Sequence, residues 1–196
     1  MRFFFGWGEP AHTTPPLRQY HPDIHVINSP MTTRRIKRRI YFCLVFFMIA
    51  LLFSGITAFP LDTEITWLNS HKSWIPEMFH GWIQTVFEGI HETGIKYPFM
   101  AYGTDWLAFA HIVIAIAFIG PLIDPVRNKW VVLWGIINCV LIFPLTFIAG
   151  HVRAIPFYHQ LVDCSFGIVG LIPLLIAYND ISKLEKLQRI NDYSYN

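Results

Sequence analysis

Four long apolar runs dominate the pattern of hydrophobic and polar positions along the chain. Each run is close to the roughly 20 residues that a helix needs to cross the hydrocarbon core of a bilayer. Backbone groups without hydrogen-bond partners are costly in lipid, which favours a helix for each run. The predicted spans are 40–59, 106–123, 130–150 and 161–178, and the second is expected to kink near Pro121. The expected fold class is an all-α membrane protein, a bundle of four transmembrane helices.

The segment between the first two spans carries a helical pattern of its own. Apolar residues recur at i, i+3 and i+4 through residues 75–92, and Gly94 is the expected C-cap. The apolar positions are Ile75, Met78, Phe79, Trp82, Ile83, Val86, Phe87 and Ile90. A helix with this pattern is typical of the membrane interface, so we expect an outer-face amphipathic interfacial helix at 75–92. Packing of its apolar face against the spans is the alternative.

The distribution of Lys and Arg predicts the orientation of the spans. With the N-terminus inside, ten basic residues flank the inner ends of the spans and three flank the outer ends. The inner ten lie at 34–39, Arg127, Lys129, Lys183, Lys186 and Arg189. Short loops rich in Lys and Arg stay in the cytoplasm, so both termini are expected there, with the spans in the cell (inner) membrane.

The segments outside the spans differ in character. Residues 1–33 are rich in Pro and His and lack periodicity, which predicts a disordered arm or an overextended start site. The four-helix domain is then 34–178, and residues 179–196 are expected to form a cytoplasmic tail with a short surface helix. A cleaved signal peptide is the alternative for the first span, but the apolar run is longer than such peptides carry.

Composition agrees with this membrane class. The chain is 54% hydrophobic and 14% charged, whereas soluble domains carry about a quarter charged residues. The dense basic run at 34–39 abuts an apolar stretch, which indicates membrane topology rather than a nucleic-acid surface. Cys43, Cys139 and Cys164 lie in apolar segments without a CxxC pattern, which indicates neither a disulfide framework nor a zinc ribbon. The expected partners are membrane lipids, with no nucleic acid.

Ionisable residues within or beside the spans are the functional candidates, because charge inside a membrane is costly. His111 and Asp163 lie at similar depth near the outer ends of their spans. His159 precedes Asp163 by one helical turn, and Arg153 is the basic residue of the loop before it. We expect one outward-facing pocket that contains Asp105, His111, His151, Arg153, His159 and Asp163.

Several chemistries fit such a pocket. Clusters of His, Asp and Glu bind zinc or iron, and the Glu-x-x-His spacing of the outer helix supplies two further ligands. The predicted metal ligands are His111, His159, Asp163, Glu88 and His91. The predicted catalytic group is Asp163, His159, Arg153 and Asp105, with Asp163 as a base and Arg153 as an anion clamp. A haem held by His111 and His159 is a further alternative.

Each candidate also has a structural interpretation. Asp163 can simply pair with Arg153 to hold the loop. His111 can hydrogen-bond a neighbouring helix, as polar groups in membrane bundles often do. The polar side of the outer helix can be an ordinary solvated face. Gly167 and Gly170 favour close helix packing, within the bundle or between protomers.

Part of this pattern resembles the VanZ-like membrane proteins. The resemblance covers residues 103–178 and rests on Asp105 and His111, followed by Arg153, Pro156, Asp163, Gly167 and Gly170. The gap from Asp105 to His111 is longer than that family's usual spacing, and an acidic residue near the end of the third span is missing. The resemblance implies a small envelope-associated membrane protein and does not imply an enzymatic activity.

The sequence therefore leads to two functional hypotheses. The first is a multi-pass membrane protein whose outward-facing pocket binds or acts on a lipid-linked or envelope component, with or without a metal. The alternative is a non-catalytic subunit or assembly factor that docks into a larger membrane complex or pairs with itself. The sequence does not decide whether the protein is an enzyme.

Overall fold

The computed structural model describes residues 30–195, and every regular element in this range is a helix. The predicted arm falls mostly on residues 1–29, which lie outside the described residues. The elements are α2 Pro30–Ala58, α3 Leu61–Ser70, η1 Lys72–Trp74, η2 Glu77–Phe79, α4 His80–Lys96, η3 Pro98–Ala101, α5 Tyr102–Ala117, α6 Ile119–Ile123, α7 Lys129–Val152 and α8 Phe157–Tyr195.

Four helical stretches are long and apolar enough to cross a membrane. They are Met31–Ala58, Pro98–Ile123, Lys129–Val152 and Phe157–Ile190, and each contains one of the predicted spans, apart from the last residue of the first. The all-α class and the four spans are thereby confirmed. By length and composition, the protein is a multi-pass membrane protein.

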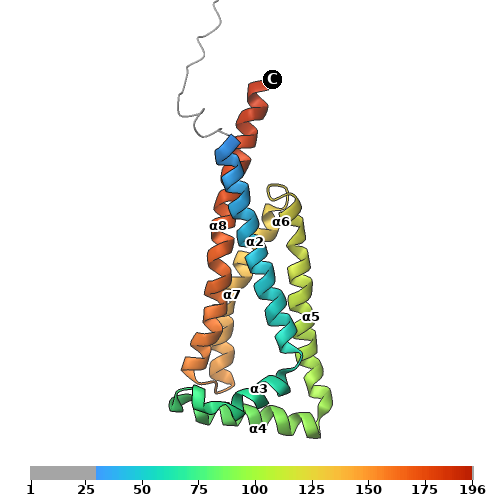
Figure 1. Ribbon diagram of the computed structural model, residues 1–196, viewed down its shortest axis with the longest axis vertical. Coiled ribbons are helices and arrows are strands. Elements are labelled where there is room, and N and C mark those ends of the chain that lie inside the picture. Colours follow the sequence, from blue (N-terminus) through green and yellow to red (C-terminus); the bar gives the residue numbers. More distant parts are fainter. Residues whose placement is uncertain (1–29, 196) are drawn as a thin grey trace, which may run out of the picture.

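The long helices run side by side along the long axis of the molecule, while α3 and α4 lie across one end (Figure 1). Helix α7 packs on α8, and α2 packs on both α5 and α8. The opposite end holds the start of α2, the turn between α6 and α7, and the end of α8. We call these the α4 end and the basic end, because the Lys and Arg residues of the three segments just named gather at the second.

The basic end is longer and better packed than the sequence predicted. Residues 179–195 do not form a separate tail, because α8 continues from its apolar part to Tyr195 without a break. Apolar residues remain on one side of this extension, where Ile181, Leu184 and Leu187 are buried. The basic run at 34–39 belongs to α2 and lies beside the extension. The two helices therefore extend the bundle at this end.

The core lies toward the basic end of the bundle. Leu44, Phe118, Val132 and Leu174 are fully buried there. Phe118 lies at the break between α5 and α6, and its ring contacts Phe47 of α2 with 4.7 Å between centroids. The predicted kink near Pro121 is this break. Most other large apolar side chains of the spans are exposed, as expected for surfaces that face lipid.

Helix α4 differs from the predicted outer helix in its limits. Ile75 precedes Pro76 and is extended, which is the conformation that a following proline favours, so the α-helix begins at His80. At its other end the helix passes through Gly94 and ends at Lys96. Ile83 is buried and faces the rest of the protein. The position of α4 in the membrane interface stays a prediction.

Candidate functional site

His159 and Asp163 are the predicted site residues that the structure brings together. Both lie in the first turns of α8, with 3.9 Å between His159 Nε2 and Asp163 Oδ1. The indole Nε1 of Trp82, on α4, donates a hydrogen bond of 3.3 Å to His159 Nδ1. The ring of His159 therefore links α4 to α8. The two side chains stay accessible, with exposed fractions of 42% and 43%.

The contacts of His159 define its tautomer. An indole N–H can only donate, so Nδ1 is the acceptor and the hydrogen of neutral His159 is on Nε2, which faces the carboxylate. The Nδ1 lone pair is thus used by the hydrogen bond from Trp82, and Nε2 lies near the carboxylate beyond hydrogen-bond distance. In this arrangement His159 has no free lone pair for a metal or for proton abstraction, and the pair is better suited to binding than to catalysis.

His111 belongs to a different part of the α4 end. It lies on α5, and its Nδ1 hydrogen-bonds the Leu107 carbonyl oxygen of the same helix at 2.8 Å. Its Cβ lies against Gly55 of α2, where the two helices approach closely. Asp105 lies one and a half turns earlier on α5 and is half-buried. Because α5 packs on α2, both residues are on a different helix pair from His159 and Asp163.

Glu88 and His91 take part in contacts within the layer formed by α3 and α4. Gln84 donates a hydrogen bond to Glu88 Oε1 at 2.6 Å. His91 Nδ1 lies 3.2 Å from Asp62 Oδ1 of α3. The first pair lies within α4 and the second connects α4 to α3, and neither involves any of the other predicted ligands.

The structure does not bring the predicted metal ligands together in a single cluster. Within residues 30–195, no group of three or more His, Cys, Asp or Glu side chains is arranged to hold a metal ion. The five predicted ligands, His111, His159, Asp163, Glu88 and His91, are divided among α5, α8 and α4. Similar depth and orientation along separate helices did not bring them to one point, since α2 packs between α5 and α8. The alternative of a haem between His111 and His159 stays a prediction.

A tight turn joins α7 to α8 beside the His159–Asp163 pair. Ala154 adopts φ of 54°, and the side chain of Gln160 is buried against Gly150 while it donates a hydrogen bond to the Ile155 carbonyl. His151 and Arg153 are exposed at this turn. The alternative in which Arg153 pairs with Asp163 is not observed among the described residues, where the partner of Asp163 is His159. Arg153 is a cation available to a ligand.

The most buried charge of the described residues is one that the sequence interpretation missed. Asp180 of α8 is fully buried, and Arg39 of α2 donates to both of its carboxylate oxygens. Lys183 Nζ lies 3.7 Å from the same carboxylate. A signal was present, because Asp180 lies three residues after Ala177 and four before Leu184 on the apolar side of the helix. A carboxylate on such a side indicates a paired, buried charge.

Asn138 is a second polar residue that the sequence interpretation passed over. It lies near the middle of α7, within an otherwise apolar span, and its side chain is exposed on the outer surface of the bundle. Trp134 and Leu141 lie on the same side of the helix and are also exposed. An amide on a lipid-facing surface is costly unless another helix supplies a partner.

The predicted close packing at Gly167 and Gly170 occurs within the bundle, where both residues lie against Cys139 of α7.

No protein-family model, curated protein or solved structure matches this chain. The resemblance to VanZ-like proteins stays a prediction.

Proposed function

We propose that the protein binds a lipid-linked anionic component of the cell envelope at the α4 end, through a site centred on His159, Asp163 and Arg153. The observation that carries the proposal is the hydrogen bond from Trp82 to His159, which holds the half-exposed pair of His159 and Asp163 next to α4. Asp163 then orients the Nε2 hydrogen of His159, and Arg153 supplies the positive charge for the anion. Arg is suited to this role because its planar group donates two parallel hydrogen bonds to phosphate.

The surroundings of the site suit a ligand with a lipid tail. Trp82 and Tyr158 lie beside it, and side chains of this kind are common where a membrane meets water. Along α8, Val162 and Phe166 are exposed and provide an apolar path away from the site. The proposed orientation puts the basic end in the cytoplasm and this site on the outer side. Recognition without a chemical step is proposed, since both ring nitrogens of His159 already have protein neighbours.

Replacing Arg153 tests this proposal. Arg153→Gln is expected to weaken binding of a polyprenyl phosphate by about tenfold, because one charge-assisted contact is lost. Binding is measured on the purified protein in nanodiscs, with the corresponding polyprenol as the uncharged probe. Lys96→Gln is the matched control, since it removes an exposed cation at the same end. Equal binding of the two lipids, or equal effects of the two variants, would contradict the proposal.

A specific observation also favours the second function, a subunit of a larger membrane assembly. The exposed Asn138 amide in the middle of α7 is both a donor and an acceptor, so it can pair with an amide or hydroxyl on a partner helix. Trp134 and Leu141 would pack beside it. The surface of α7 around Asn138 is therefore the proposed docking surface of this alternative.

Substitution of Asn138 tests this alternative. Asn138→Leu is expected to shift the solubilised protein from a larger species to the monomer in size-exclusion chromatography with light scattering, because the interhelical hydrogen bond is worth about 1 kcal/mol. Asn138→Gln keeps an amide at this position and should retain the association. A wild-type protein that is already monomeric when extracted in mild detergent from its native membrane would exclude this role for α7.

A further inference from the structure

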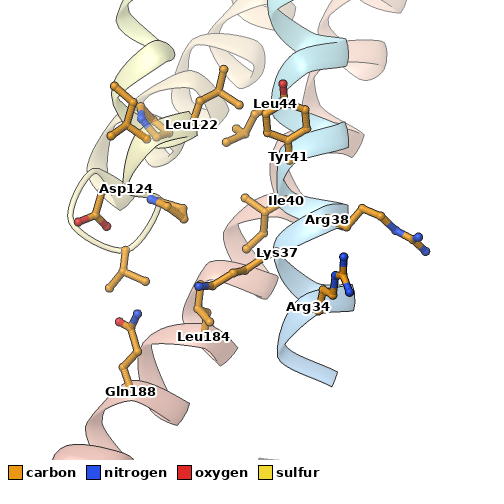
Figure 2. Close-up of a pocket in the computed structure, with 14 residues that line it drawn as sticks. Arg34, Lys37, Arg38, Ile40, Tyr41, Leu44, Leu122, Asp124, Leu184 and Gln188 are labelled. Atoms are coloured by element: carbon orange, nitrogen blue, oxygen red, sulfur yellow. The ribbon is translucent and has the colours of Figure 1, made fainter. Parts of the chain in front are cut away.

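A groove at the basic end is lined by both cations and apolar side chains, and it has no part in the proposed function. It has a volume of about 630 Å³ and lies between α2, the turn that follows α6, and the extension of α8 (Figure 2). Its positively charged lining comes from α2, where Arg34, Lys37 and Arg38 contribute three cations. Its apolar lining includes Ile40, Leu44, Leu122 and Leu184.

The three cations of the groove are available to a ligand. None of them forms an ion pair with a described residue, whereas the neighbouring Arg39 is taken up by Asp180. Figure 2 shows Lys37 reaching from α2 toward Leu184 on α8. Arg34 and Arg38 lie one turn apart on the same side of α2, away from Asp124. Lys37 therefore points into the groove, while Arg34 and Arg38 supply positive charge at its edge.

We propose that this groove binds the phosphate head group of an anionic phospholipid, with an acyl chain along its apolar lining. Three features support a lipid over a small soluble anion. The cations lie just before Ile40, where the apolar part of α2 begins, and so at the depth of the head groups. The apolar lining continues directly from the cations into the span. The groove is also partly open to its surroundings rather than enclosed, so that a lipid can enter it.

A carboxylate on the wall opposite α2 limits where the phosphate can bind in the groove. This residue is Asp124, and its Oδ1 accepts a hydrogen bond of 3.0 Å from the backbone N–H of Arg127. Its negative charge repels an anion and directs the phosphate toward α2. Binding of the lipid in the groove therefore depends on the cations of α2. Non-specific electrostatic attraction of the lipid would depend equally on the other basic residues at this end. Basic pockets of this kind between membrane helices are known to hold anionic head groups.

The test compares two variants that lose the same charge. Arg34→Gln/Lys37→Gln removes two cations from the groove, and Lys186→Gln/Arg127→Gln removes two exposed cations from the same end outside its lining. Binding of phosphatidylglycerol and of phosphatidylcholine to the detergent-purified full chain is measured by native mass spectrometry. Thermal unfolding, followed with a thiol-reactive dye, shows that each variant is folded.

The groove variant is expected to bind phosphatidylglycerol about tenfold more weakly, and the control variant is expected to lose less than about twofold. Wild-type protein should prefer phosphatidylglycerol to phosphatidylcholine. Equal losses in the two variants would overturn the proposal in favour of diffuse attraction. Absence of a preference between the lipids, or displacement of the lipid by millimolar glycerol phosphate, would also overturn it.

Discussion

Arg39→Met is expected to destabilise the protein by about 3 kcal/mol, because it leaves the buried carboxylate of Asp180 without its bidentate partner. Lys183, at 3.7 Å and largely exposed, compensates only in part. The two residues are unequal in burial, since the side chain of Arg39 is 56% exposed and that of Asp180 is 1% exposed. Loss of the arginine therefore removes the partner of a desolvated charge, whereas loss of the aspartate leaves an arginine that water can solvate.

The measurement uses the thiols of the protein itself. Cys43, Cys139 and Cys164 are free and buried, so a thiol-reactive dye reports thermal unfolding in detergent. We expect Asp180→Asn to lower the melting temperature less than Arg39→Met does. The double variant Arg39→Met/Asp180→Leu should recover much of the loss, since a matched apolar pair often replaces a buried ion pair without cost. Asp180→Asn as damaging as Arg39→Met would contradict this explanation.

Gly55→Val is expected to destabilise the α4 end by about 2 kcal/mol, because α2 and α5 approach closely at this residue. A Cβ at Gly55 would lie 2.9 Å from the Ala108 carbonyl oxygen and 3.0 Å from the Cβ of His111. The first of these atoms belongs to the backbone, so a rotamer change cannot relieve the contact. The two helices would have to separate, which also moves His111.

The matched control is Gly103→Val, on the helix that Gly55 contacts. A Cβ at Gly103 would meet nothing within 4 Å, so this change should leave the melting temperature close to that of the wild type. The same thiol assay applies to both variants. Similar melting temperatures for Gly55→Val and Gly103→Val would mean that the close approach of α2 and α5 does not limit stability.

The fold class was predictable because it depends on local properties of the chain. Each span carries enough apolar residues to be recognised alone, and a helix satisfies its own backbone hydrogen bonds in lipid. The predicted break near Pro121 has the same local origin, since proline cannot continue the hydrogen-bond pattern of a helix. The limits of α4 and α8 were harder to predict, because they depend on where packing partners extend beyond the apolar core.

The candidate site was predictable only in part, because most of its contacts depend on which helices pack together. His159 and Asp163 were predicted to share a helix face, and the structure agrees because this spacing is a property of one helix. Their relation to His111 depended on which helices are neighbours, and α2 rather than α8 is the neighbour of α5. The role of Trp82 depended in the same way on how α4 crosses the start of α8.

The sequence by itself determined the four apolar spans, their helical conformation and the concentration of basic residues in three segments. The tertiary structure alone decided the pairing of Arg39 with Asp180, which are far apart in the chain, and the division of the predicted metal ligands among separate helices. The physical reason is that hydrophobicity and backbone hydrogen bonding act within a segment, whereas ion pairs and ligand sites depend on which segments pack together.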